Sequence, residues 1–300
     1  MRIGVDIPNA GVLPKQLGLL EMARQAELGG AESLWVSDHL LMVDRDSTDY
    51  PYSTDGRPTW SVSAAYYEAF VCCAMMAAHT KSCRVGTAIL VLPQRNVLEV
   101  AKVAASLDQL SGGRLVLGLG AGWYELEFEA LGYDYASRGR RFDDMLAVLR
   151  SCWTVRPDAF RGSEITIPPD VVMSPAPAQD GGPPLLIGGM TRPALRRAAR
   201  LGDGWLALAY VHNWDRTNLA SKLAELQSLR TATGVTGRFD HVLKLHAGPD
   251  EGDALPELAA EAQELGFSEV IIEPPWETGV DAALETLAAV RSRVTSGPDS

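Results

Sequence analysis

The sequence predicts a (β/α)8 barrel, on the basis of three observations. Short apolar segments rich in Val, Ile and Leu alternate eight times with segments of helical periodicity. Strands that are apolar on both faces are typical of a parallel sheet covered by helices. The chain has 300 residues, and a barrel of eight such units takes about 250 residues plus insertions. An open, doubly wound sheet is the alternative that the same alternation allows.

The first half of the chain supplies four of these units. Strands are expected at 2–7, 32–37, 84–92 and within 112–123, and helices at 14–29, 64–79, 96–110 and 138–153. Leu17, Leu20 and Ala23 recur at helical spacing in the first helix, which Gly29 and Gly30 end. The polar, turn-rich stretch 44–60 predicts a long loop, which in a compact domain is usually functional or disordered.

The second half repeats the pattern after an interruption. Residues 155–183 are rich in proline and lack a helical period, so we expect an insertion of loops and short strands before the fifth strand. Strands then follow at 184–189, 203–208, 239–245 and 269–273, and helices at 192–201, 214–233, 255–265 and 280–294. Since there is no flexible linker, we expect one domain over residues 1–294 and a tail over 295–300.

The composition excludes several classes of protein. Hydrophobic residues make up 46% and charged residues 22%, as in globular proteins. No run of about 18 uncharged apolar residues occurs, and the N-terminus leads directly into a strand, so we expect neither a membrane span nor a leader. The four cysteines lie in apolar surroundings without metal spacing, which favours reduced core residues in a cytoplasmic protein. The net charge of -11 argues against nucleic acid as a partner.

The glycine-rich end of the fourth strand has two interpretations. Gly118-Leu119-Gly120 begins like a dinucleotide-binding turn, but Trp123 stands where the third glycine belongs. Glycines on a strand also let a flat ligand or another backbone approach closely, or relieve crowding in a barrel wall. Trp123, beyond the strand end, can line a pocket for a flat ligand, whereas Trp35 and Trp205 are expected in the core.

In a barrel the active site lies at the carboxyl ends of the strands. Asp38-His39 is the sharpest pair there, because a histidine can exchange a proton near neutral pH while a carboxylate beside it orients the ring. The alternative is that His39 only caps the next segment or bonds a backbone carbonyl. Further strand-end positions are Asp6, Ser37, Thr87–Leu90, Gly118–Trp123, Gly188–Thr191, Leu208–Tyr210, His246 and Glu273.

The turn Gly188-Gly189-Met190-Thr191-Arg192 joins a strand to a helix. Free N–H groups and the helix dipole at such a turn bind phosphate well. The alternative is a plain turn in which Thr191 is the N-cap, and both can hold together. The histidines show no metal-ligand spacing, so no metal is expected, and without a G-x-S-x-G motif a serine hydrolase is not supported.

Several stretches together resemble the luciferase-like superfamily of flavin and deazaflavin enzymes, and most closely the subgroup of probable coenzyme F420-dependent oxidoreductases. They occur in the family's order over roughly residues 1–210. The matching stretches are Leu34-Trp35-Val36-Ser37-Asp38-His39, Tyr50-Pro51-Tyr52, Val85 to Pro93, Leu107 to Arg114, Gly118 to Trp123 with Glu127 to Gly132, and Ile187-Gly188-Gly189 with Ala198 to Trp205.

The resemblance implies a flat tricyclic ring across the strand ends, phosphate at the Gly188-Gly189 turn, and Asp38 and His39 as catalytic residues beside the ring. It also implies a non-proline cis peptide at Ala88-Ile89. The cofactor-binding residues that it implies are Asp38, Thr87, Ala88, Ile89, Gly120, Ala121, Gly122, Trp123, Gly188, Gly189, Met190 and Thr191. Substrate contacts are expected from Tyr50, Tyr52 and Trp123.

One departure limits the comparison. The sugar-phosphate dehydrogenase of the family has a catalytic glutamate just after the fourth-strand glycines, where this chain has Trp123, with Glu125 and Glu127 further on. Neither that enzyme's proton chemistry nor its substrate can therefore be transferred to this chain.

The function expected is hydride transfer between coenzyme F420 and a small organic substrate. One alternative is a monooxygenase of the same fold that takes reduced FMN from a partner reductase and uses O2; another is a barrel that binds a ligand without catalysis. The resemblance further implies a homodimer, for which the apolar helices at 64–79 and 96–110 could supply the interface.

Overall fold

Eight parallel strands close into a barrel in the computed structural model, which describes residues 1–44, 50 and 61–296. The strands are β1 (Arg2–Asp6), β2 (Ser33–Val36), β3 (Arg84–Val91), β4 (Leu115–Gly120), β7 (Leu185–Gly188), β8 (Gly204–Tyr210), β9 (Asp240–His246) and β10 (Glu269–Ile272). Their order around the barrel is β1-β10-β9-β8-β7-β4-β3-β2. The prediction of a (β/α)8 barrel is confirmed, and closure rules out the doubly wound sheet.

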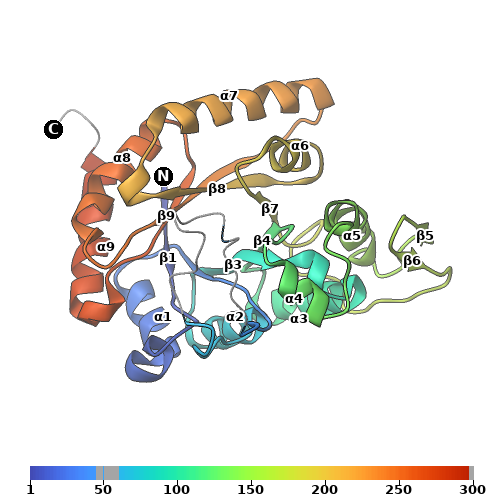
Figure 1. The fold of residues 1–300 in the computed structure, drawn as a ribbon, viewed down its shortest axis with the longest axis horizontal. Helices are drawn as coiled ribbons and strands as arrows, with labels where there is room; N and C mark the ends of the chain where they lie inside the picture. The colour runs from blue at the N-terminus through green and yellow to red at the C-terminus, as the bar shows by residue number, and fades with distance from the viewer. Residues whose placement is uncertain (45–49, 51–60, 297–300) are drawn as a thin grey trace.

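Helices cover the outside of the barrel (Figure 1). They are α1 (Leu19–Leu28), α2 (Ala69–His79), α3 (Val97–Ser111), α4 (Glu125–Ala130), α5 (Arg138–Cys152), α6 (Arg192–Leu201), α7 (Arg216–Thr233), α8 (Leu255–Glu264) and α9 (Val280–Ser296). Local sequence sets their ends. In α3, for example, the Asn96 side chain accepts a hydrogen bond from the N–H of Leu98, and Gly112 ends the helix with a φ of 72°.

Two helix predictions need correction, and one further helix was not predicted. The expected helix 14–29 is split into a π-helical segment (Pro14–Gly18) and α1, because Gly18 has a φ of 81°. The expected helix 64–79 begins at Ala69, since the Glu68 carboxylate caps it by accepting from the N–H of Val71. Helix α4 was not expected from the sequence.

The segment before the fifth barrel strand carries a two-stranded antiparallel sheet of β5 (Phe160–Arg161) and β6 (Thr166–Ile167). It lies at the edge of the molecule, beyond α5 (Figure 1). At the other end of the chain, α9 continues to Ser296, into the segment expected to be a tail.

The barrel interior is filled by one small cluster of side chains, separate from the larger core between strands and helices. The cluster consists of Trp35, Ala88, Val116, Leu186, Leu206, Val242 and Ile271. Trp35 is fully buried, as is Trp205, so both tryptophans lie in the core as expected. A side chain on Gly86 would approach the Trp35 ring to 2.6 Å, which explains why this position on β3 lacks one.

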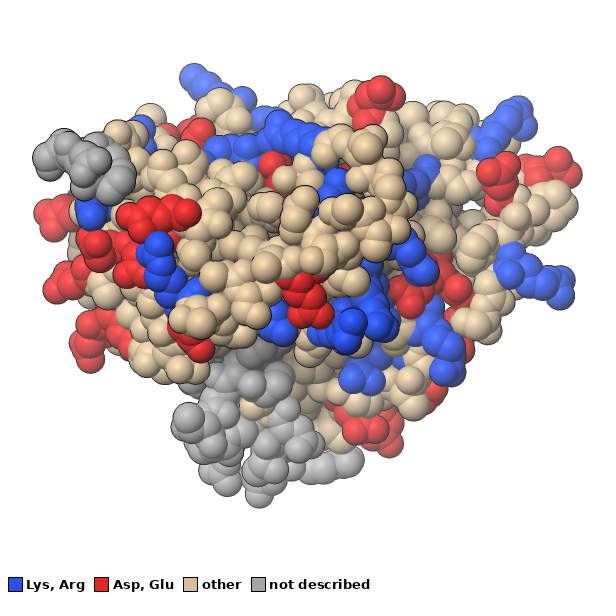
Figure 2. Space-filling view, turned by 90° about the horizontal axis from the view of Figure 1, so that it is seen from above, with Lys and Arg blue, Asp and Glu red and all other residues tan. Residues whose placement is uncertain are grey.

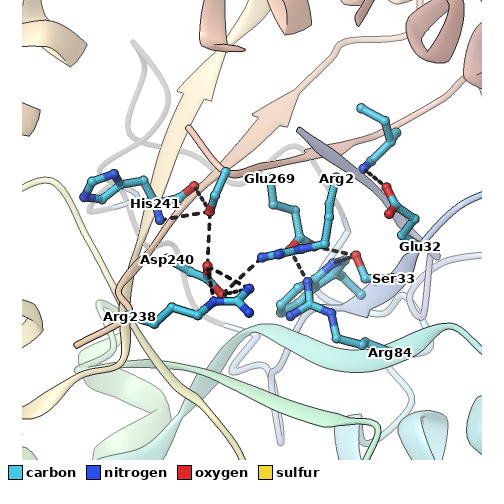
Figure 3. Close-up of polar contacts among 11 residues, drawn as sticks. Arg2, Glu32, Ser33, Arg84, Arg238, Asp240, His241 and Glu269 are labelled. Atoms are coloured by element: carbon cyan, nitrogen blue, oxygen red, sulfur yellow. Dashed lines mark hydrogen bonds and ion pairs between the residues drawn. The ribbon is translucent and has the colours of Figure 1, made fainter. Parts of the chain in front are cut away.

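The amino ends of the strands are joined by buried charges (Figure 3). Glu269, the first residue of β10, is fully buried and accepts hydrogen bonds from Arg2 Nε at 3.0 Å and from Ser33 Oγ at 2.5 Å. It also contacts Arg84. Arg2 reaches on to Asp240 at 3.1 Å. Five neighbouring strands, from β3 round to β9, are thus tied together at the end opposite the expected active site.

The surface charge is mixed on the face seen in Figure 2. Lys and Arg side chains stand among Asp and Glu side chains there, and a group of acidic side chains lies at the left edge. Within the described residues, the helices are all too short or too polar to cross a membrane.

Candidate active site

A cavity of about 1660 Å³ opens at the carboxyl ends of the strands. Each of the eight barrel strands, or the segment just after it, contributes lining residues. This is the end of the barrel at which such enzymes place their chemistry. Most of the residues expected to bind a cofactor lie here. They are Asp38, Ala88, Ile89, Gly120, Ala121, Gly122, Trp123, Gly188, Gly189, Met190 and Thr191.

The floor of the cavity is formed around Ile89. The Ala88-Ile89 peptide bond is cis, as the family resemblance implied. A Cβ atom on Gly120 would lie 2.4 Å from Ile89 Cδ1, and one on Gly188 would lie 2.7 Å from Ile89 Cγ2. These glycines therefore make room for the isoleucine side chain, which presents an apolar surface between them.

The neighbouring residues Thr87 and Gly118 form the barrel wall rather than the cavity. The Thr87 hydroxyl is fully buried and donates to the Gly118 carbonyl at 2.8 Å. A Cβ atom on Gly118 would lie 2.1 Å from the Thr87 carbonyl oxygen. Crowding between strands is thus the reason for the glycine at 118. Thr87, expected to bind the cofactor, does not border the cavity.

His39 is held by Glu127. The imidazole Nδ1 lies 2.8 Å from Glu127 Oε2, and the N–H of Leu40 donates to Glu127 Oε1 at 2.6 Å. Burial of Glu127 opposes its ionisation, but the hydrogen bond and charge of His39 outweigh it and lower the carboxyl pKa. An ionised Glu127 favours the proton on Nδ1, which leaves Nε2 as the nitrogen on the opposite edge of the ring.

Asp38 was expected to orient the ring of His39, but its carboxylate binds Val91 and Arg95. Its carboxylate accepts from the N–H of Val91 at 2.9 Å and from Arg95 Nη2 at 2.7 Å. Burial raises the pKa of Asp38, against the charge of Arg95 and the hydrogen bond from Val91. Asp38 therefore joins the end of β2 to the end of β3, while Glu127 orients the histidine.

Aromatic rings surround His39. The ring centroids of Tyr66 and Trp123 lie 5.4 Å and 5.9 Å from that of His39, both edge-on. Tyr50 lies 5.0 Å from Trp123 and lines the cavity, as expected of a substrate contact. Tyr52, the other tyrosine expected to contact substrate, is outside the described residues.

The turn after β7 leads into α6. Gly189 has a φ of 119°, and its carbonyl accepts from the Trp205 indole N–H at 2.8 Å. Thr191 occupies the N-cap position without a capping side-chain bond. Arg192 is 66% exposed and lies 3.4 Å from Glu225, whereas Arg197 lines the cavity. The N–H of Gly189 donates to the Leu206 carbonyl at 3.3 Å, and Arg197 pairs with Asp143 at 2.8 Å.

A cluster of charged side chains lines the cavity at the ends of β1, β9 and β10. Lys244 Nζ lies 2.9 Å from Asp6 Oδ1 and 2.9 Å from Glu273 Oε1, and His246 Nδ1 also contacts Glu273. Burial raises the pKa of Asp6 to about 6. Burial also opposes charge on Lys244 and Glu273. The charges of Asp6 and Glu273 nevertheless raise the pKa of Lys244, and the charge of Lys244 with the hydrogen bond from His246 lowers that of Glu273 to about 2.

Sequence reasoning missed three of the residues that shape this site. Glu127 lies on a six-residue helix too short to show a period, and Tyr66 lay in an expected helix. Lys244 did leave a signal, since it is the single charge in the apolar run Val242-Leu243-Lys244-Leu245. Among the residues that the structure describes, His, Cys, Asp and Glu side chains form no group of three suited to a metal ion.

The chain is similar to several known proteins. An uncharacterized protein of Mycobacterium tuberculosis is 32% identical over 265 residues, covering 87% of each chain. The oxygenase component of the flavin-dependent trigonelline monooxygenase of Acinetobacter baylyi is 28% identical over 56% of this chain and 42% of its own. The structure of an F420-dependent secondary alcohol dehydrogenase, with an F420-acetone adduct, superimposes with a TM-score of 0.75 at 19% identity over 97% of this chain and 99% of that one.

A family model, described as luciferase-like monooxygenase, matches residues 11–251, which include every barrel strand from β2 to β9. The match covers the floor at Ile89, the His39–Glu127 pair and the turn before α6. The chain belongs to the luciferase-like monooxygenase family.

Proposed function

We propose that the protein transfers hydride between coenzyme F420 and a small organic substrate. The observation that carries this proposal is the buried His39–Glu127 pair, 2.8 Å apart, at the rim of a cavity with an apolar floor at Ile89. The deazaflavin would supply the carbon that gives or accepts the hydride. The protein would supply the binding site, the exclusion of water and a proton.

The shape of the cavity supports a flat ring and a phosphate-bearing tail. Ile89, flanked by the bare backbones of Gly120 and Gly188, offers an apolar surface for a ring. The turn before α6 leads into the N-terminus of a helix of ten residues, and a helix N-terminus favours phosphate. Met190 and Trp123 also line the cavity.

His39 is the group that would exchange the proton. With Nδ1 bound to Glu127, the proton passes through Nε2, to or from an oxygen on the substrate carbon that gains or loses the hydride. When the imidazole is protonated, the Glu127 carboxylate stabilises its charge in surroundings poor in water. Glu127 is a positioning residue, because it acts through His39.

A second candidate is a monooxygenase that uses reduced FMN and O2. It is favoured by the relative from Acinetobacter baylyi, which is named as flavin-dependent and as an oxygenase component. The same floor and the same turn suit FMN, whose ring is also tricyclic and whose tail ends in phosphate. In this case a partner reductase would have to supply the reduced cofactor.

Titration with each cofactor separates the two candidates. The hydride-transfer proposal predicts saturable quenching of tryptophan fluorescence by F420, with Trp123 as the reporter in the cavity. Tight FMN binding without F420 binding would replace it with the monooxygenase.

Catalysis itself is tested by substitution. His39→Ala should lower turnover by about 100- to 10,000-fold, the usual contribution of a general acid or base. His241→Ala, near the amino end of β9 and so at the far end of the barrel from the cavity, is the matched control. Asp38→Ala should also lower turnover, because it frees the end of β3. If neither His39 nor Asp38 matters, the barrel binds a ligand without catalysis.

We also propose a homodimer built on α2 and α3. Large apolar side chains are exposed on both helices, and Leu110 is 88% exposed. The others are Val71, Met75 and Val103. Light scattering would give twice the mass of the chain, and Leu110→Lys should reduce it towards that of one chain. A mass of one chain for the unaltered protein would contradict the dimer.

A further inference from the structure

The charged cluster of Asp6, Lys244, Glu273 and His246 is not used by the proposed function. It lines the same cavity as His39, but from the other side. His39 follows β2 and Lys244 belongs to β9, and strands β1 and β10 lie between them in the barrel. A substrate whose reacting end lies at His39 and that extends across the cavity therefore contacts this cluster with its other end.

The cluster offers hydrogen bonds to that second part. An ammonium group has three N–H donors, and in the described part of the chain Lys244 gives two of them, to Asp6 and to Glu273. The third can bind a ligand oxygen in the cavity. His246, which is half-buried, contacts Glu273 through Nδ1, so Nε2 lies on the other edge of its ring.

The charges of the cluster select against ions. Lys244 is already flanked by two carboxylates at 2.9 Å, so an anion that approached it would be repelled by both. A cation would have to compete with Lys244 and His246 for carboxylate oxygens that they already engage, namely Asp6 Oδ1 and both oxygens of Glu273. A neutral hydroxyl or carbonyl oxygen meets neither penalty. A hydroxyl can in addition donate to a carboxylate oxygen of Asp6 or Glu273.

We propose that Lys244 and His246 form a subsite for a neutral hydroxyl or carbonyl oxygen, distinct from the oxygen that exchanges a proton with His39. The proposal rests on the proposed function for the position of the reacting end. The substrate class is then a neutral molecule with two oxygen functions, such as a diol or a hydroxyketone. Hydrogen bonds from a charged donor stabilise such a contact by about 1.5–3 kcal/mol, or roughly tenfold to a hundredfold in affinity.

Three matched probes test the preference. Cyclohexane-1,4-diol, 4-hydroxycyclohexanecarboxylate and 4-aminocyclohexanol share one hydroxyl and differ in the group at the other end. Binding to the full chain is measured by calorimetry at neutral pH. We expect the diol to bind at least about tenfold more tightly than either ion. An equal or better affinity for the carboxylate or the ammonium probe, or no binding of the diol, overturns the proposal.

Two variants assign the preference to the cluster. Lys244→Met should weaken diol binding by about tenfold or more, while Lys15→Met, exposed near the N-terminus, should not change it. Because Lys244→Met leaves two buried carboxylates without their cation, which can prevent folding, His246→Gln is the second variant. It should weaken diol binding severalfold. Unchanged affinity in a folded Lys244→Met protein, or in His246→Gln where the first does not fold, overturns the proposal.

The test is independent of the cofactor. Under the same conditions the unaltered protein is titrated with F420. Binding of F420 without a preference for the diol refutes the subsite alone. A preference for the diol without binding of F420 refutes the hydride-transfer function alone.

Discussion

Buried ion pairs occur at both ends of the barrel, and they differ in what surrounds them. At the amino ends of the strands, Glu269 is fully buried and receives Arg2, Arg84 and Ser33 (Figure 3). At the carboxyl ends, Lys244 lies between two carboxylates and borders a cavity of about 1660 Å³. The first network is closed on itself, and the second faces space that a ligand can fill.

The difference shows how one type of interaction serves two purposes in one fold. A carboxylate surrounded by protein donors has no capacity left for a ligand, so it contributes to stability. An ammonium at the wall of a cavity keeps a donor for a ligand, and its partners set which ligands it accepts. This agrees with the general division of such barrels into a stabilising end and a catalytic end.

The largest effect is expected at Glu269. Glu269→Ala removes the carboxylate and leaves Arg2 and Arg84 facing each other, which should destabilise the protein by about 3–5 kcal/mol. Urea unfolding measures this loss. Cofactor affinity of the folded fraction should stay the same, because the site lies at the other end. A loss below about 1 kcal/mol would contradict a stabilising role.

The second effect concerns Glu127. Glu127→Gln should lower turnover by about 100-fold, or 2.7 kcal/mol of activation free energy, since the imidazole loses the carboxylate that orients it. The pH profile of turnover should change as well. Glu285→Gln, exposed on α9, serves as the control. A loss of the same factor at every pH would indicate a merely structural role for Glu127.

The third effect is a pH dependence of stability at the carboxyl end. Burial raises the pKa of Asp6 to about 6, so its contribution to stability is full below about pH 4 and is lost as the pH rises through 6. Relative to Asp6→Asn, the unaltered protein should lose on the order of 2 kcal/mol of unfolding free energy between pH 4 and pH 7. The lowered pKa of Glu273, about 2, acts in the opposite direction below pH 4.5, so it overlaps this window only between pH 4 and pH 4.5. A difference that stays constant or grows with pH would contradict this description of Asp6.

The smallest effect is expected at the rim of the amino-end network. Arg238 is 73% exposed and contacts Asp240 at 3.2 Å. Exposed ion pairs contribute little, so Arg238→Ala should change stability by less than about 0.5 kcal/mol. A loss comparable to that of Glu269→Ala would mean that the network depends on its exposed part as much as on its buried carboxylate.

The sequence predicted the barrel well because buried parallel strands are continuous apolar runs. Each expected strand overlaps the observed one, as β3 does at Arg84–Val91. Short or irregular elements left no such signal. Helix α4 has only six residues, and the extended stretch before α2 forms a bridge between Ala10 and Tyr66 that depends on tertiary contact.

The site was predicted in its position more than in its contacts. His39 and the glycine turn before α6 follow strands, so the fold alone places them at the cavity. The pairing of His39 with Glu127 joins residues 88 positions apart, and its neighbour Asp38 is engaged by Arg95 instead. Which of two carboxylates contacts a histidine depends on side-chain directions in the folded chain, which the sequence does not show.

The central claim, that this cavity binds a deazaflavin, is tested most directly by competition between the two cofactors. The protein is saturated with F420, FMN is added, and the F420 that remains bound is measured after filtration. We expect F420 to bind in a one-to-one ratio to the chain and FMN to displace it only in large excess. Complete displacement by an equal amount of FMN, or no retention of F420 at the start, would contradict the claim.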